Sequence, residues 1–150
     1  MKLVVIESPF APPAQTKTGD EHAWYAQRTS TYLRALAQWC IGMHWAPYAS
    51  HKLLTQWLED HVVEQREIGI ACGLAWARHA DLAIVGVNYG ISSGMERGIA
   101  AHATNGVPVE YVFLDGDWRR WSHHWPASNV AMKVHRTSDR KAAAKWVQAT

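Results

Sequence analysis

The sequence has few of the features that mark secreted, membrane or nucleic-acid-binding proteins. Its two cysteines, Cys40 and Cys72, are too few for a disulfide framework or a metal-ligand cluster. We therefore expect both to be small core residues in the reducing cytoplasm. No apolar run approaches the ~20 residues that a membrane span needs. The formal net charge of +2 is too small to indicate binding of a nucleic-acid polymer.

Hydrophobic residues, by contrast, are abundant enough to build a core. They make up 48% of the residues. The chain has 150 residues, which is a typical length for one domain. The opening MKLVVIESPF is typical of a first strand and not of a signal peptide, because Glu7 and Pro9 interrupt the apolar run. Nine tryptophans are spread along the chain, and we expect most of them in the core or at a subunit interface.

The order of apolar patterns predicts an α/β fold. Strands are expected over 2–8, 44–51, 80–87, 107–114 and 130–136, and helices over 24–43, 64–79, 95–105 and 138–148, with 52–60 as a short helix or lid. The segment 118–129 reads as irregular. Alternating strands and helices predict a flavodoxin-like or Rossmann-like parallel sheet of about five strands with helices on both faces. Ligands of such sheets bind beyond the carboxyl ends of the strands.

Three loops leave those strand ends, and one of them has the composition of an anion site. The loops read ESPFAPP, APYASH and NYGISSG. In the third, Gly90 to Gly94 lies between a strand and a helix, so backbone N–H groups at the helix start can face an anion, and Ser92 and Ser93 add hydroxyl donors. The loop lacks the GK[ST] ending of a Walker A motif and is not GxGxxG. An ordinary strand–helix connection is the alternative.

Glu96 follows this loop directly. A carboxylate beside a phosphate site must address another part of the ligand, because it would repel the phosphate itself. A nucleotide meets both needs, with its phosphate on the loop and the C1' of its sugar at the carboxylate. The alternative is an exposed glutamate that stabilises the positive end of the helix dipole.

The motif SGMERGIA, preceded by ARHADLAIVG and followed by HATNGVPVEYVFL, resembles the nucleoside 2-deoxyribosyltransferase superfamily. It also resembles the related 2'-deoxynucleoside 5'-monophosphate N-glycosidases. The similarity covers about residues 1–114 and is greatest to small members found in phage and bacterial genomes. It implies one domain over 1–150, with 1–114 as the core and 115–150 as a C-terminal extension.

The resemblance also implies the residues of the site. Glu96 would be the nucleophile or the oxocarbenium stabiliser, and Tyr32 matches a family tyrosine near that carboxylate. Ser92, Ser93 and Gly94 would hold the phosphate or the 5' end. The full set of implied ligand-binding residues is Ser8, Pro9, Phe10, His51, Gly90, Ser92, Ser93 and Gly94.

One position departs from the family pattern. Many members carry an acid/base aspartate in the second long helix, where this sequence has Gly73. Asp60, Glu64 or Glu67 could replace it from nearby, and the sequence does not choose among them. The missing aspartate keeps a second interpretation open, a non-catalytic protein that senses or sequesters a nucleotide on the same fold. A third interpretation, a structural or interaction protein, rests only on the tryptophan count.

The leading hypothesis is an enzyme that cleaves or transfers the N-glycosidic bond of a deoxynucleoside or its 5'-monophosphate. We expect no metal and no organic cofactor, and we interpret His123 and His124 as a polar surface loop. Arg66 and Arg97 are either phosphate ligands or solvated helix residues. By resemblance, the protein would be a cytoplasmic homodimer or higher homo-oligomer, or a phage product in the host cytoplasm. The sequence does not indicate which base is recognised.

Overall fold

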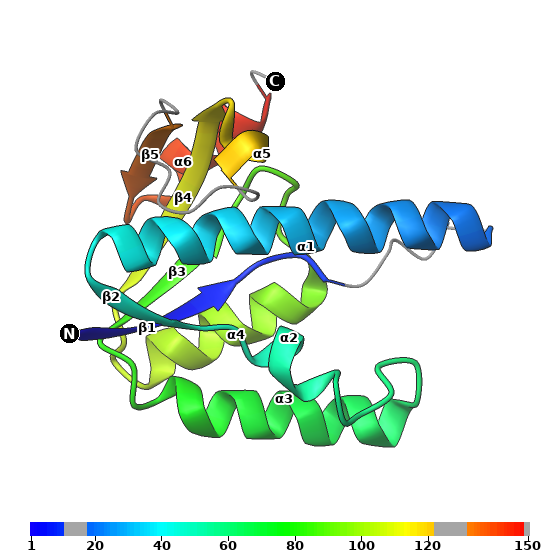
Figure 1. Cartoon of the computed structure of the whole chain (residues 1–150). Helices are drawn as coiled ribbons and strands as arrows, with labels where there is room; N and C mark the ends of the chain where they lie inside the picture. The colour runs from blue at the N-terminus through cyan, green and yellow to red at the C-terminus, as the bar shows by residue number, and fades with distance from the viewer. Residues whose placement is uncertain (11–17, 122–131, 149–150) are drawn as a thin grey trace.

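A five-stranded sheet forms the centre of the protein (Figure 1). The computed structural model describes residues 1–10, 18–121 and 132–148. Its strands are β1 (Lys2–Glu7), β2 (Trp45–Tyr48), β3 (Leu82–Gly86), β4 (Val109–Gly116) and β5 (Met132–Thr137). They lie in the order β2-β1-β3-β4-β5, and the first four are parallel to one another. This confirms the predicted α/β class.

The last strand differs in direction from the rest of the sheet. β5 pairs antiparallel to β4, with Val112 opposite Arg136. A parallel neighbour would need a long crossover connection, usually a helix. Of the connection between the two strands, the structure describes one helix, the single turn α5 (Trp118–Trp121). The sequence pattern had indicated no helix in this segment.

Side chains alternate between two separate cores, one on each face of the sheet. On β4, Val112 and Leu114 face the first core, whereas Tyr111 and Phe113 face the second. The long helix α1 (Gly19–Gly42) covers the first face, and α4 (Ser93–Thr104) with α6 (Arg140–Gln148) covers the second. Because side chains alternate with a period of two, neighbouring residues of one strand pack under helices on opposite faces of the sheet.

α1 begins five residues before the predicted start at Trp24. Thr18 is its N-cap: the Thr18 hydroxyl accepts a hydrogen bond from the Glu21 N–H at 3.2 Å, and the Glu21 carboxylate accepts one from the Thr18 N–H at 3.0 Å. This capping box satisfies two backbone donors that would otherwise lack partners. The extra turns carry the helix past the sheet, toward the strand ends (Figure 1).

The helix α3 (Val63–Ala77) packs through small residues and not through its apolar stripe. Ile68 and Trp76 are more than half exposed, and Cys72 is exposed with them, whereas Gly73 and Ala77 are buried. The prediction that Cys72 is a core residue is therefore wrong. The reason is that α3 packs chiefly on the short helix α2 (Ser50–Leu54) and on α4, where close approach favours small side chains. Cys40 is buried as predicted.

Among the described residues, no helix is long and apolar enough to cross a membrane.

Candidate functional site

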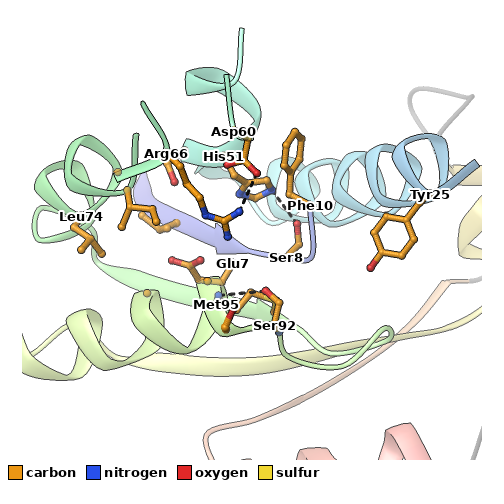
Figure 2. A pocket seen from close by; sticks show the side chains of 17 residues that line it. Glu7, Ser8, Phe10, Tyr25, His51, Asp60, Arg66, Leu74, Ser92 and Met95 are labelled. Atoms are coloured by element: carbon orange, nitrogen blue, oxygen red, sulfur yellow. Dashed lines mark hydrogen bonds and ion pairs between the residues drawn. The ribbon is translucent and has the colours of Figure 1, made fainter. Parts of the chain in front are cut away.

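A hollow of about 460 Å³ lies at the carboxyl end of β1, between the α2–α3 pair and the start of α4 (Figure 2). Its volume falls within the range of small-molecule sites. The polar residues that line it are Glu7, Ser8, Ser50, His51, Asp60, Arg66, Ser92 and Ser93. Phe10 and Tyr25 add aromatic rings. The hollow is therefore at the edge of the sheet where the strand-end loops were expected to meet.

The start of α4 forms one wall of this pocket. Ser92 is the N-cap, and its hydroxyl accepts a hydrogen bond from the Met95 N–H at 3.4 Å. The N–H groups of Ser93 and Gly94 lie in the first helical turn, where backbone donors have no partner within the helix. The positive end of the helix dipole adds to their attraction for an anion.

Arg66 brings a positive charge to the same wall. A side chain at Gly94 would lie 4.0 Å from the Arg66 Nη2, so the guanidinium stands directly over the helix start. Arg66 also pairs with Asp60 at 3.2 Å, and both side chains are about one third exposed (Figure 2). Exposed ion pairs contribute little free energy, so a phosphate could compete with Asp60 for the guanidinium.

Glu7, the last residue of β1, supplies a carboxylate to the pocket, beside Gly98 and one turn of α4 away from the wall at Gly94. Its side chain is 15% exposed, and its Oε1 lies 3.0 Å from the His102 Nε2. The carboxylate rests on Gly98, where an added Cβ would collide with it. Gly94, Gly98 and His102 are spaced four residues apart, so they form the stripe of α4 that faces β1.

The expectation that Glu96 points into the same pocket is wrong. At about 100° per residue, Glu96 lies about 200° around the helix from both Gly94 and Gly98. Its carboxylate forms a two-bond ion pair with the Arg140 guanidinium of α6, and Glu96 is not among the residues that line the hollow. The structure thus places Glu96 against the C-terminal helix.

Tyr32 is also outside the pocket, contrary to the expectation that it lies near the carboxylate. It is fully buried between α1 and the sheet, and burial raises the pKa of its hydroxyl. The hydroxyl donates to the Asn88 Oδ1 at 2.8 Å and accepts from the Asn88 N–H at 3.2 Å. Asn88 in turn bonds both backbone groups of Leu114. The geometry assigns Tyr32 to joining α1 to the ends of β3 and β4.

We expect Tyr32→Phe to lower the free energy of unfolding by about 1–2 kcal/mol, because Asn88 then loses a buried partner. Thermal denaturation measures the effect. Tyr48→Phe is the matched control: the Tyr48 hydroxyl is buried without a partner among the described residues, so its removal should be neutral or stabilising. Equal losses in the two variants would contradict the assignment.

Of the eight ligand-binding residues implied by the resemblance, the structure brings six together. Ser8, Phe10, His51, Ser92, Ser93 and Gly94 line the hollow. Pro9 and Gly90 do not line it. Gly90 has φ of +77°, so its role is to make a turn that other residues rarely adopt.

His51 contacts the first loop from α2. Its Nε2 lies 3.2 Å from the Ser8 Oγ, and its ring packs 5.6 Å from the Phe10 ring. Burial lowers the pKa of His51, with the nearby Glu7 opposing that shift. The imidazole is therefore neutral at pH 7, where it can donate or accept a hydrogen bond but carries no charge.

This lowered pKa predicts a loss of stability on acidification. Below the ordinary histidine pKa of about 6.5 the unfolded chain takes up a proton before the folded chain does, so the free energy of unfolding falls until the folded pKa is passed. We expect urea denaturation to show a smaller loss between pH 7.5 and 5.5 for His51→Gln than for the parent protein. Identical losses would show that His51 titrates alike in both states.

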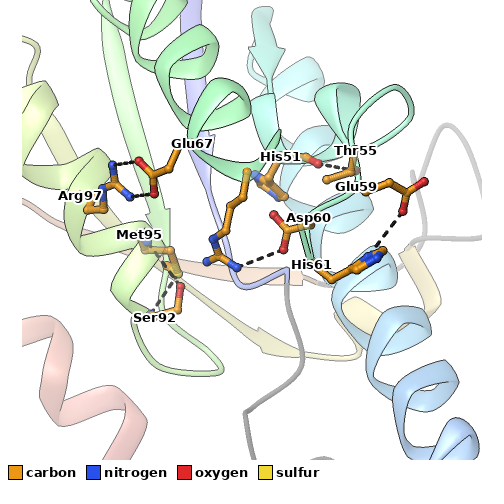
Figure 3. A network of polar contacts seen from close by, with 10 residues as sticks. His51, Thr55, Glu59, Asp60, His61, Glu67, Ser92, Met95 and Arg97 are labelled. Atoms are coloured by element: carbon orange, nitrogen blue, oxygen red, sulfur yellow. Dashed lines mark hydrogen bonds and ion pairs between the residues drawn. The ribbon is translucent and has the colours of Figure 1, made fainter. Parts of the chain in front are cut away.

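The structure also explains the departure at Gly73. A Cβ at this position would lie 2.8 Å from Ser50 Cβ and Oγ, so no aspartate fits unless α2 moves. Of the three proposed substitutes, Asp60 lines the pocket, whereas Glu67 pairs with Arg97 at 2.9 Å on the surface (Figure 3) and Glu64 does not line the hollow.

Sequence reasoning missed Glu7, Gly98 and His102 and left Arg66 undecided. The available signal for Glu7 was its place as a charged residue that ends a buried apolar strand, next to Ser8. His123 and His124 lie outside the described residues. Within 1–10, 18–121 and 132–148, no three His, Cys, Asp or Glu side chains gather in a way that would hold a metal ion.

The sequence profile of a protein family, described as "Domain of unknown function (DUF7768)", matches residues 2–112. The matched range begins with β1 and includes every residue that lines the pocket. No curated protein and no solved structure matches the chain significantly.

Proposed function

The chain belongs to the DUF7768 family, and we propose that it binds a 2'-deoxynucleoside or its 5'-monophosphate and cleaves or transfers the N-glycosidic bond. The observation that carries the proposal is the pairing of an anion-binding wall and a carboxylate in one pocket. The α4 amides and Arg66 form the wall, and Glu7 supplies the carboxylate.

The spacing along α4 supports this choice of ligand. Gly94 marks the anion-binding end, and Gly98, which supports Glu7, lies one turn further along, about 6 Å. A nucleoside 5'-monophosphate carries its phosphate on C5' and its base on C1' of one sugar. The same molecule can therefore place phosphate on the amides and C1' near Glu7.

The remaining lining residues suit the other parts of such a ligand. Phe10 and Tyr25 offer flat apolar faces for a base. Ser8 and His51 offer hydroxyl and imidazole groups for sugar oxygens. Neither set indicates which base is preferred.

Glu7 replaces Glu96 as the proposed nucleophile. An oxygen of Glu7 forms a bond to C1' while the bond from C1' to the base nitrogen breaks, and the base leaves with the electron pair and takes a proton from water. Attack by water on C1' then frees Glu7 and gives hydrolysis, whereas attack by a second base gives transfer.

A non-catalytic nucleotide-binding protein is the second candidate. It is favoured by the close packing of Gly73 on Ser50, which leaves no space for an acid/base side chain at that position. It requires the same pocket and the same anion-binding wall, but no role for Glu7 in bond cleavage.

One experiment separates the candidates. The full chain is incubated with the four common deoxynucleosides and their 5'-monophosphates, free base is measured by chromatography with mass detection, and binding is measured by thermal shift. Base release supports the enzyme, and stabilisation without release supports the binding protein. Neither release nor stabilisation with any compound would overturn both. The cytoplasmic location and the homo-oligomer stay predictions.

A further inference from the structure

The only described residue that bonds the Glu7 carboxylate lies behind it, in the protein interior. The His102 Nε2 is 3.0 Å from Oε1, and the His102 side chain is fully buried. Oε2 has no hydrogen-bond partner among the described residues, and Glu7 lines the hollow. Figure 2 shows the carboxylate between the Arg66 side chain and α4. One oxygen is thus held from the interior while the carboxylate borders the pocket.

We propose that His102 is a positioning residue that donates its Nε2–H to Glu7 and fixes the carboxylate for attack at C1'. The inference rests on the proposed function, because it gives Glu7 the role of nucleophile. A histidine that only filled space in the core would not need to direct a ring N–H at the Glu7 carboxylate.

The position of the proton follows from burial. The other ring nitrogen, Nδ1, is buried and has no partner among the described residues. A proton on Nδ1 would be an unpaired buried donor, which is costly and rare in proteins. The imidazole is therefore neutral with its proton on Nε2, and the Glu7 oxygen is the acceptor. In this arrangement the hydrogen bond from His102 occupies Oε1 and leaves Oε2 for attack at C1'.

The backbone of α4 completes the arrangement. Glu7 rests on Gly98, and any side chain at this position would push the carboxylate away. His102 is one turn beyond Gly98 on the same stripe of the helix. Since Gly94 at the anion-binding end belongs to the same stripe, one rigid helix sets the positions of both the phosphate wall and the carboxylate.

The proton position can be measured without activity. Long-range ¹H–¹⁵N spectroscopy of the imidazole rings in the full chain at pH 7 reports which nitrogen of His102 is protonated, with His102→Gln used to assign the signals. We expect a neutral ring protonated at Nε2 whose signals shift in Glu7→Gln. A ring protonated at Nδ1, or at both nitrogens, would overturn the inference even if the protein is active.

The positioning role is tested by two substitutions compared in the base-release assay. The amide nitrogen of glutamine can take the place of Nε2, whereas leucine has no donor. We expect His102→Leu to lower kcat about 10- to 100-fold with KM within threefold, by analogy with residues that orient metal ligands. We expect His102→Gln to stay within about fivefold of the parent. Thermal denaturation checks that both variants are folded.

Two kinetic outcomes would overturn the inference: equal losses in two folded variants, or parent-like activity of His102→Leu. If the parent protein releases no base, the proposed function fails instead, and the proton position still decides whether His102 donates to Glu7.

Discussion

Glu7→Gln is expected to lower the rate of base release by about a thousandfold or more, while the protein still binds the nucleotide. Glutamine has nearly the same shape as glutamate, so the pocket is preserved. The amide is not a nucleophile and carries no charge to stabilise an oxocarbenium-like centre. The loss should therefore appear in kcat and not in KM. Single-turnover assays with an excess of protein over a deoxynucleoside monophosphate measure it.

Glu96→Gln is the matched control, because it makes the same chemical change on α4, outside the pocket. It removes the charge that pairs with Arg140 and leaves the hollow unchanged. We expect activity within about threefold of the parent. The reverse pattern, with Glu96→Gln inactive and Glu7→Gln active, would restore Glu96 as the nucleophile and refute the role of Glu7.

Arg66→Ala should weaken binding of a deoxynucleoside monophosphate about 10- to 100-fold, the effect of losing a charge-assisted hydrogen bond. It should leave binding of the corresponding deoxynucleoside within a few fold, because that compound has no phosphate to contact the guanidinium. Calorimetric titration of both compounds gives the two ratios. The contrast between them identifies the phosphate wall independently of catalysis.

Arg97→Ala tests whether any arginine near α4 would give the same result. Arg97 is paired with Glu67 on the surface, and that ion pair raises the pKa of its guanidinium. It does not line the pocket. Both ligands should bind Arg97→Ala as they bind the parent. Equal weakening of the two ligands by Arg66→Ala would show that Arg66 supports the pocket wall and does not contact phosphate.

Much of the fold was predictable because the strands are apolar runs of the right length. The run predicted over 80–87 corresponds to β3. The segments that follow β1 and β3, including the start of α4, supply Ser8, Phe10, Ser92, Ser93 and Gly94 to the pocket. Parallel strands bring their carboxyl ends to one edge, so this convergence follows from the fold class alone. The direction of β5 could not be predicted, because the apolar pattern of a strand does not reveal which strand it pairs with or in which direction.

The candidate site was less predictable, because it depends on which way each helix and strand faces. The motif around Glu96 shows which residues are adjacent along the helix, but not which side of the helix faces the sheet. Only the packing against β1 shows that Gly94, Gly98 and His102 form the stripe of α4 that faces β1. Glu96 is then necessarily on another side. In the same way, the sequence places Glu7 at a strand end without telling which face it occupies.

Tyr32 illustrates a second limit. A tyrosine on the first helix looks the same in sequence whether it contacts a ligand or a buried amide. Here Asn88 takes both hydrogen-bonding functions of the hydroxyl, a partnership over 56 positions in the chain that no local pattern indicates.

The most direct test is a crystal structure of Glu7→Gln with the deoxynucleoside monophosphate that binds most tightly. We predict that the phosphate lies within hydrogen-bonding distance of the Gly94 N–H and the Arg66 guanidinium, with C1' facing the side chain at position 7. A nucleotide bound outside this hollow, or one whose C1' faces Glu96, would contradict the account.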